Sequence, residues 1–374
     1  MIYLLYICSV SEHISIDHRS IMKKNYRIKD IAELSGVSTG TVDRILHKRG
    51  KVSIEAREKV EKVLKEIDYH PNLIARSLAL KKQYHLITVT PVVHPGSYWD
   101  QLCVGIDAAE NDLFSYNVKV KRLYFDQYDK TSFDNLIPVI DNTDCQGVVI
   151  ATLFKDSVLK LTQLLDKKEV PYVLIDAFIE GTQAISYYGT PSFDSGYIAG
   201  RLIFNQIKKD EDLVIFKYVR VDNEASTQGR IREEGFHKYL AEKGYEGRIH
   251  HLHFRAGNDV ENKAIIKEFL QNNPQIKRGI LFNSKAYTIC NYLDEININK
   301  DFKLVGYDAI EGNIKYLKEA RITHLIAQRP EVQGVNSIKA LFRHLVLKEK
   351  NELINYMPID ILMKENIQYY NNYI

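Results

Sequence analysis

The stretch that decides the fold of the N-terminal part is residues 27–50, which read RIKDIAELSGVSTGTVDRILHKRG. Apolar residues recur at helical spacing from Ile28 to Leu34, which predicts a short amphipathic helix. Gly36 can then adopt the left-handed backbone conformation that a sharp turn between two helices needs. Ser38 is a natural N-cap for a second helix. The stretch therefore predicts a helix–turn–helix.

The segment that follows extends this pair of helices to a small basic unit. Ser53 can cap a third helix, whose apolar residues recur from Val60 to Ile67. Residues 23–82 hold 15 Lys+Arg and 8 Asp+Glu, a net charge of +7, whereas the rest of the chain has a net charge of −4. Such a basic module favours a polyanion partner, and the helix–turn–helix makes double-stranded DNA that partner. A solvated basic face and a purely structural helical cap are the alternatives.

The residues that would read DNA follow from the geometry of such a module. Its second helix enters the major groove and presents its first residues to base edges. Arg44, one turn further on, can grip a guanine with two hydrogen bonds or hold a phosphate, and Lys29 is suited to a phosphate contact. The residues of this module that we expect to contact DNA are Lys29, Ser38, Thr39, Gly40, Thr41, Arg44 and His47.

Residues 71–82 are predicted to form a hinge between the helical unit and the body of the chain. Pro71 ends the third helix, and Asn72 can cap a short helix that runs to Leu80. This helix is apolar on one side and has no core of its own to pack against. We therefore expect it to become ordered on binding.

From His85 onward the chain alternates short β-rich runs with amphipathic helical stretches. This alternation predicts parallel sheets covered by helices, and its length predicts two α/β lobes. Ligands of such sheets bind beyond the carboxyl ends of the strands, so polar and aromatic residues there are site candidates. The candidates at strand ends and in the loop after the first strand are His94, Tyr98, Trp99, Asp176 and Asn283.

Other features narrow the possible classes of function. The four cysteines form no CxxC pair, which suits a reduced cytosolic protein. His251 and His253 share one face of a predicted strand, but with no third ligand visible we expect an exposed strand and no metal site. The sequence contains no GxxxxGK[ST], GxGxxG or HExxH motif and no evident nucleophile–base pair, so we expect no enzymatic activity.

Residues 1–22 are expected to be an extension that is non-native or disordered. The first ten residues are apolar, but they are too short to span a bilayer. Met22 directly precedes the basic helical unit and is the expected start of translation.

Two adjoining stretches carry a resemblance to a known family. IKDIAELSGVSTGTVDRILH, followed by YHPNLIARSLALKK at 69–82, resembles the headpiece and hinge of the lactose-repressor (LacI) family of bacterial transcription regulators. The body resembles the two-lobed core of that family, which is shared with periplasmic sugar-binding proteins. The matching landmarks in the body are FDSGYIAGRL (193–202), GRIREEGF (229–236), LFNSKA (281–286) and LVGYDA (304–309).

The resemblance implies a domain organisation for everything after Met22. We expect an all-α helix–turn–helix headpiece at 23–70, a hinge helix at 71–82 and an α/β core at 83–374, with two lobes of parallel sheet flanked by helices. The expected segments of the first lobe are about 83–189 and 323–349, and those of the second lobe are about 190–322 and 350–374.

For the hinge, the resemblance implies a homodimer whose two hinge helices meet in the minor groove of the DNA. A leucine from each hinge helix wedges a base step open and kinks the duplex. The matching residue here is Leu78, and packing of Leu78 in a hydrophobic core is the alternative. The hinge residues expected to contact DNA are Asn72, Ala75, Arg76 and Leu78.

For the core, the resemblance implies an effector pocket lined by Arg232 and Asp308. A guanidinium fork and a carboxylate together can bind vicinal hydroxyl groups. Trp99, the only tryptophan, could stack on a sugar ring or have a structural role instead. The effector-binding residues expected from this match are Arg232 and Asp308, and Phe193 and Gln328 are further candidates.

Together these features predict a sequence-specific DNA-binding transcriptional regulator, in particular a repressor. Its operator affinity would be controlled by a small polar ligand, a sugar or a derivative, bound between the core lobes. We expect a homodimer in the cytoplasm, associated with the nucleoid, that needs no cofactor, metal or membrane. The alternatives are an exported solute-binding protein for sugar uptake and a regulator controlled by a partner protein.

Overall fold

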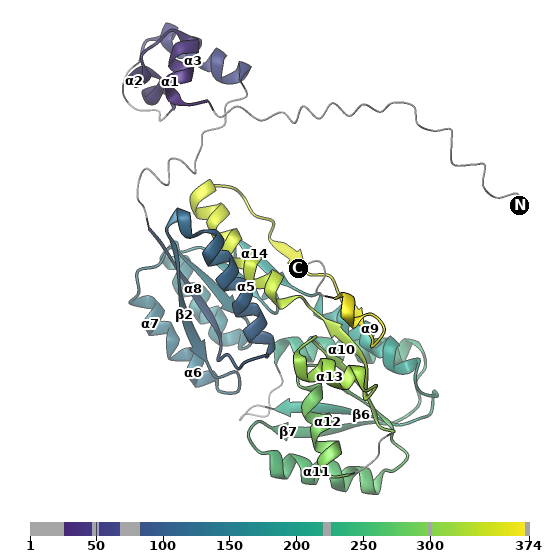
Figure 1. Cartoon of the computed structure of the whole chain (residues 1–374). Coiled ribbons are helices and arrows are strands. Elements are labelled where there is room, and N and C mark those ends of the chain that lie inside the picture. The colour runs from purple at the N-terminus through teal and green to yellow at the C-terminus, as the bar shows by residue number, and fades with distance from the viewer. Residues whose placement is uncertain are drawn as a thin grey trace, which may run out of the picture. The chain divides into compact units, whose positions relative to one another are not determined.

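The computed structural model describes residues 26–46, 50, 52–67, 83–219, 226–297 and 301–370. These residues belong to two compact units, an N-terminal helical unit and a larger α/β core, with the division at Asn72 and Leu73 (Figure 1). The expected extension at 1–22 and the expected hinge at 71–82 lie outside the described residues.

The N-terminal unit contains the predicted helix–turn–helix followed by a third helix. Its helices are α1 (Ile28–Ser35), α2 (Thr39–Leu46) and α3 (Ile54–Glu66). Gly36 ends α1 in the left-handed conformation, with φ of 66°, and the amide of Val37 donates to the carbonyl of Ala32 at 3.1 Å. The hydroxyl of Ser53 accepts a hydrogen bond from the amide of Ala56 and so caps α3.

A small apolar core holds the three short helices together. Ile31 and Ala32 of α1, Val42 of α2, and Val60 and Val63 of α3 are all buried. Helices of this length are marginal alone, so this shared core is what stabilises the unit. The predicted fold of the headpiece is confirmed.

The first lobe of the core is built on a parallel sheet of six strands. Their order is β11-β5-β4-β3-β1-β2, and every neighbouring pair is parallel. The strands are β1 (Tyr84–Pro91), β2 (Val118–Phe125), β3 (Gly147–Ala151), β4 (Tyr172–Ile175), β5 (Ser186–Gly189) and β11 (Ile354–Tyr356). The inner strands β3, β4 and β5 are buried along their whole length, as expected of a sheet covered on both faces.

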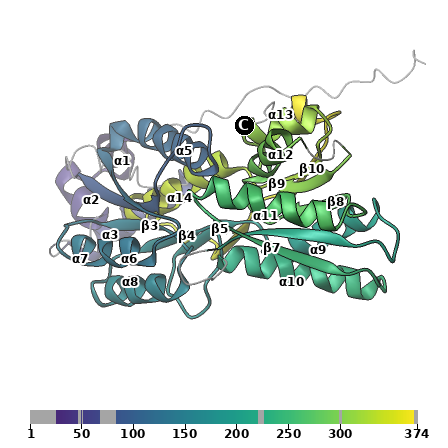
Figure 2. The same cartoon turned by 90° about the horizontal axis from the view of Figure 1, so that it is seen from below.

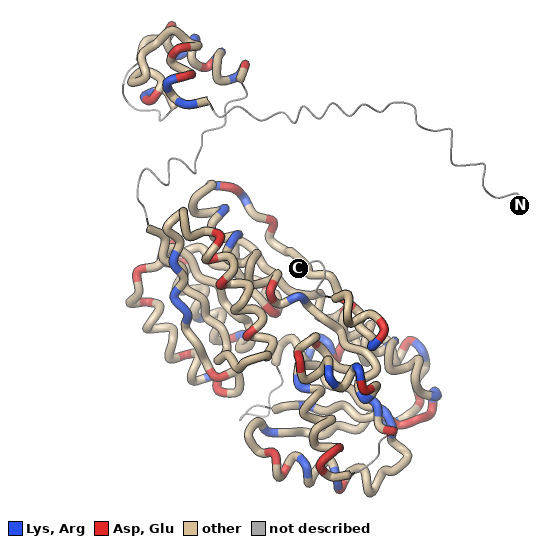
Figure 3. Tube along the Cα trace, viewed as in Figure 1, with Lys and Arg blue, Asp and Glu red and all other residues tan. Residues whose placement is uncertain are grey.

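Helices cover both faces of the first sheet (Figure 1). Helices α5 and α14 pack on each other on one face, and α6, α7 and α8 cover the other. These helices are α5 (Tyr98–Asp112), α6 (Lys130–Asp134), α7 (Leu136–Asp141), α8 (Lys155–Lys167) and α14 (Pro330–Phe342). At the edge strand β2, Lys119 and Lys121 are exposed, and Figure 3 shows basic residues along this strand. Charged side chains on an edge strand oppose pairing with other chains.

The second lobe repeats this plan with strand order β12-β10-β9-β8-β6-β7. Only the pair β10–β12 is antiparallel among the strands that the structure describes in this sheet. The strands are β6 (Leu213–Val219), β7 (Ile249–Arg255), β8 (Arg278–Leu281), β9 (Lys303–Tyr307), β10 (Ile322–Ala327) and β12 (Asp360–Leu362).

Two helical layers enclose the second sheet (Figure 2). Successive residues of its strands alternate between two apolar clusters, because side chains of a strand point to opposite faces. Thus Val214 and Phe216 pack with one layer of helices, and Ile215 packs with the other. The layers are α9 (Ser192–Phe204) with α10 (Thr227–Glu242), and α11 (Asp259–Asn272) with α12 (Ala286–Glu295) and α13 (Glu311–Lys318).

The chain crosses between the lobes three times, and two of the crossings differ from the expected segments. We expected 323–349 in the first lobe, but β10 belongs to the second sheet and the crossing follows at Gln328. We expected 350–374 in the second lobe, but β11 adds an edge strand to the first sheet before β12 joins the second. Strand β11 has only three residues, two of them exposed, so no apolar run in the sequence marks it.

Glycines allow the two helix pairs of the core to pack in close contact. A methyl group at Gly196 of α9 would lie 1.8 Å from the carbonyl oxygen of Arg232 in α10, and one at Gly235 would lie 2.0 Å from that of Phe193. In the first lobe, Gly105 and Gly334 have the same role between α5 and α14. The landmarks FDSGYIAGRL and GRIREEGF therefore carry glycine where two backbones meet, and this contact sets the position of Arg232.

We expect Gly196→Ala to lower the free energy of unfolding of the core by about 1–3 kcal/mol, because the added methyl group forces α9 and α10 apart. The measurement is urea unfolding of the full chain, monitored by the fluorescence of aromatic side chains in the core. Gly40→Ala is the matched control, since a methyl group there meets only the Ser38 hydroxyl at 3.9 Å. Equal stability of Gly196→Ala and the wild type would contradict the close contact.

Candidate functional site

A cavity of about 100 Å³ lies between the two lobes of the core. Residues that line it come directly after strands of both sheets: Asp176 after β4, Asn283 near the end of β8, and Asp308 after β9. The carboxyl ends of both sheets therefore face one cavity, which is where ligands of parallel sheets bind.

Seven of the nine expected effector-binding residues line this cavity. They are Tyr98, Trp99, Asp176, Arg232, Asn283, Asp308 and Gln328. His94 and Phe193 are not among the lining residues. His94 is exposed in the turn before α5, where its carbonyl accepts from the amide of Ser97. Phe193 is 42% exposed, because the buried face of α9 is formed by its neighbours Ser192 and Ser195 instead.

The cavity also has lining residues that the sequence reasoning missed. Most of them follow a strand or stand beside a predicted residue, so a stricter use of the strand-end rule would have found them. Gln228 is different, since it lies one turn before Arg232 on α10. The missed residues are Gln127, Tyr128, Leu153, Tyr218, Ser226, Gln228, Phe282, Ser284 and Lys285.

A buried polar network forms one wall of the cavity. The guanidinium of Arg232 donates to the side-chain oxygen of Gln328 at 2.6 Å. The side-chain nitrogen of Gln328 in turn donates to the carboxylate of Asp308 at 2.7 Å. All three residues are at least 96% buried. Hydrogen bonds in such buried surroundings fix the orientation of each side chain.

Arg232 is held in place on several sides. Its guanidinium lies over the ring of Tyr307 at 4.1 Å and donates to the carbonyl of Phe282 at 2.9 Å. Its Nε–H has no acceptor among the described residues. Buried donors are normally paired, so a ligand with acceptor oxygens suits this part of the cavity.

Asp308 is a carboxyl group with an unusual proton affinity. Burial raises the pKa of Asp308 to about 6, although Arg232 and the hydrogen bond from Gln328 act in the opposite direction. The backbone of Asp308 has φ of 69°, and its amide donates to the carbonyl of Ile326 at 3.0 Å. Asp308 can therefore both donate and accept hydrogen bonds close to neutral pH.

Aromatic rings and a lysine complete the cavity. Tyr98 and Trp99 at the start of α5 pack edge to face, with ring centroids 5.0 Å apart. Lys285 of the second lobe lies over the ring of Tyr128 from the first lobe at 5.0 Å, and over that of Tyr218 at 5.2 Å. The contact between Lys285 and Tyr128, a cation over an aromatic ring, connects the lobes across the cavity.

The network also joins two of the three crossings between the lobes. Thr190, at the crossing that follows β5, donates to the side-chain oxygen of Gln328 at 3.1 Å. Gln328 itself is the residue at the crossing that follows β10. A ligand that contacts Arg232, Asp308 or Gln328 therefore acts directly on the segments about which the lobes would move.

The second candidate site is the surface of α2 in the N-terminal unit. Thr39, Gly40 and Arg44 of α2 are exposed, as are Ser38 just before it and Lys29 of α1, whereas Thr41 is half-buried. The hydroxyls of Ser38 and Thr41 lie 2.9 Å apart, and the amide of Thr41 donates to that of Ser38. The expected DNA contacts outside the described residues are His47, Asn72, Ala75, Arg76 and Leu78.

Two family models match the chain. The model for bacterial regulatory proteins of the lacI family matches residues 27–72. The model for a periplasmic binding protein domain matches residues 87–350.

Relatives of known name match over nearly the whole chain. The HTH-type transcriptional repressor PurR of Erwinia tasmaniensis is 24% identical over 88% of this chain and 94% of its own length. The ribose operon repressor of Lactococcus lactis is 25% identical over 91% of this chain and 98% of its own.

Solved structures match the core. One from Bacteroides fragilis, assigned to the LacI transcriptional regulators, has a TM-score of 0.74 and 34% identity over 78% of this chain and all of its own. A glucose-galactose binding protein from Geobacillus stearothermophilus has a TM-score of 0.66 at 16% identity over 76% of this chain and 99% of its own, which shows the shared fold alone. Among the described residues, no helix is long and apolar enough to cross a membrane.

We expect Asp308 to make the stability of the core depend on pH. Asp308 holds its proton more tightly in the folded state than in the unfolded state. Its stabilising contribution to the free energy of unfolding is therefore present below about pH 4 and is lost as the pH rises through about 6. The loss amounts to roughly 2–3 kcal/mol. Urea unfolding of the wild type and of Asp308→Asn between pH 4 and 7 measures it.

In that experiment the wild type should lose stability relative to Asp308→Asn as the pH rises, because asparagine keeps the acceptor for Gln328 but does not ionise. Asp194→Asn, at an exposed position of α9, is the control and should follow the wild type. Parallel profiles for all three proteins would contradict the raised pKa of Asp308.

Proposed function

Since the chain belongs to the lacI family of bacterial regulatory proteins and is a DNA-binding transcriptional regulator, we propose that it represses transcription under the control of a carbohydrate or a carbohydrate derivative. The observation that carries this proposal is the polar cavity between the lobes, whose wall includes Gln328 at a crossing between them. The ligand would bind there, and operator DNA would bind the helix–turn–helix.

The chemistry of the cavity supports a polyhydroxylated ligand. Arg232 offers donors in a fixed plane, while Asp176 and Asp308 offer carboxylate acceptors. Asn283 can donate and accept, and Trp99 offers an apolar ring beside these polar groups. Alternating hydroxyl and C–H surfaces of a sugar match this combination. The name of the ribose operon repressor among the relatives is in keeping with such a ligand.

Control of DNA binding would follow from movement of the lobes. We propose a homodimer in the cytoplasm whose two helix–turn–helix units read the two halves of a nearly palindromic operator. Binding between the lobes changes their relative orientation, and with it the spacing of the two DNA-reading units. Because ligand and DNA are linked, each must change the affinity of the other by the same factor.

The experiment that tests this proposal uses the full chain and a panel of sugars, sugar phosphates and uronic acids. A ligand that binds only the folded state raises its stability, by about 2.7 kcal/mol at a hundredfold excess over the Kd. We expect at least one member of the panel to raise the unfolding temperature and to change operator binding. Stabilisation by none of them would instead favour control by a partner protein.

We expect Trp99→Leu to weaken binding of the carbohydrate identified in that panel by about tenfold or more, which is 1.4 kcal/mol or more. Leucine keeps an apolar side chain at this position but removes the flat ring. Isothermal titration calorimetry measures the affinity. Phe193→Leu is the matched control, since it removes an aromatic ring outside the cavity; equal losses in both variants would contradict the assignment of Trp99.

We expect Arg44→Ala to reduce discrimination at one base pair of each operator half by roughly 1–3 kcal/mol. The operator is first selected from random DNA, and binding to its single-base variants is then measured by fluorescence anisotropy. Lys29→Ala is the comparison, because loss of a phosphate contact should weaken binding to all sequences alike. A uniform loss for Arg44→Ala would show that Arg44 holds a phosphate and reads no base.

A further inference from the structure

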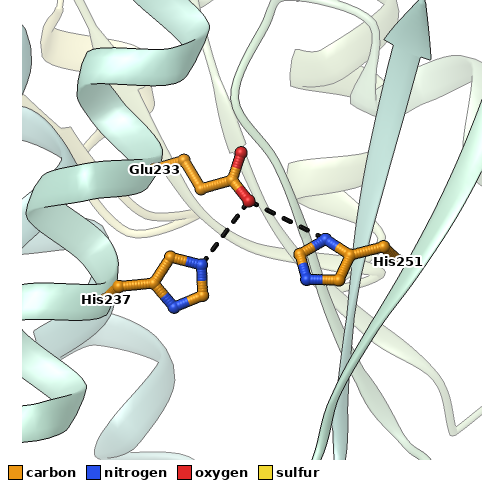
Figure 4. Close-up of side chains that lie close together, drawn as sticks. All are labelled: Glu233, His237 and His251. Carbon is orange, nitrogen blue, oxygen red and sulfur yellow. Dashed lines mark ion pairs between the residues drawn. The ribbon is translucent and has the colours of Figure 1, made fainter.

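Three potential metal ligands meet on the surface of the second lobe, away from the residues that line the cavity. Glu233 and His237 lie one turn apart on α10, and His251 projects toward them from the edge strand β7 (Figure 4). A carboxylate oxygen of Glu233 lies 3.5 Å from Nε2 of His237 and 3.7 Å from Nδ1 of His251.

These distances fit a common metal ion. Ligand atoms about 2.0–2.1 Å from a tetrahedral ion lie about 3.4 Å from one another. Two of the three separations are within a few tenths of an ångström of this value, and all three ligand atoms lie within 4.8 Å of one another. A small rotation of the His251 or His237 ring would bring the third pair to the same spacing.

Access and ligand type point to the same class of ion. The side chains of His237 and His251 are 42% and 33% exposed, so an ion can enter from solvent. Imidazole nitrogen with a carboxylate oxygen suits zinc and its neighbours among the transition metals, whereas magnesium and calcium prefer oxygen ligands alone. Three protein ligands leave a tetrahedral ion one position for water.

Lys217 of β6 is the group that such an ion would replace. Its ammonium lies 2.6 Å from the same carboxylate oxygen of Glu233. A lysine side chain is long and flexible, and its ammonium can turn out to solvent when an ion of higher charge occupies the carboxylate. The carboxylate of Glu233 thus already holds one cation, with which a metal ion would compete.

We propose that Glu233, His237 and His251 form a site for a divalent transition-metal ion of the zinc class, which displaces the ammonium of Lys217 and links α10 to β7. From the sequence we expected no metal site at His251 and His253, because Glu233 and His237 belong to a helix that precedes the strand. The site is separate from the proposed effector site, since Arg232 lines the cavity and none of the three ligands does.

The test is a titration of the metal-depleted full chain with zinc and, separately, with cobalt. Competition with a chelating dye gives the affinity for zinc, and the visible absorption of cobalt reports tetrahedral geometry. We expect His237→Ala and His251→Ala each to weaken zinc binding by at least about tenfold and to remove the tetrahedral cobalt spectrum. Lys217→Met should tighten zinc binding, because it removes the competing cation.

His250→Ala is the matched control, since its ring points to the opposite side of β7 and contacts Asp212 at 3.0 Å. It should bind zinc as the wild type does. Unfolding temperatures without metal should be similar for all the variants, which separates loss of ligands from loss of fold. Equal zinc binding by the wild type and a His237→Ala/His251→Ala double variant would overturn the proposal. A loss of zinc affinity in His250→Ala as large as that in His237→Ala or His251→Ala would also overturn it.

Discussion

The hydrogen bonds of the Gln328 side chain are the interaction on which the core depends. Its oxygen accepts from Arg232 and Thr190, and its nitrogen donates to Asp308. These partners come from α10, from another crossing and from the end of β9. One buried amide thus holds together the wall of the cavity and the segments that join the lobes, so the cavity and the lobe orientation cannot change independently.

Much of this arrangement could be predicted from local sequence. The turn at Gly36 and the cap at Ser38 define the helix–turn–helix, because both act within a few residues. The rule that ligands bind at carboxyl ends of parallel strands located Asp176, Asn283 and Asp308, since each directly follows an apolar run. Gly196 belongs to a recognisable sequence landmark. The reason why this position needs glycine, its close contact with the backbone of Arg232, is visible only in the structure.

What the sequence could not predict depends on contacts between distant segments. Strand β11 is too short to show a pattern, and it exists because β5 offers it an open edge. His94 was expected at the cavity, but the capping of α5 by Ser97 turns it outward. The cluster of Glu233, His237 and His251 required the packing of a helix against an edge strand. In each case pairing or packing in three dimensions decided the outcome.

The central claim is that a ligand between the lobes controls the binding of DNA by the helix–turn–helix. The most direct measurement is the Kd of the full chain for its selected operator, with and without a saturating carbohydrate from the panel. The account predicts a change of about fivefold or more, and the same change in carbohydrate affinity when operator is present. An operator Kd that stays the same at saturating carbohydrate would contradict it.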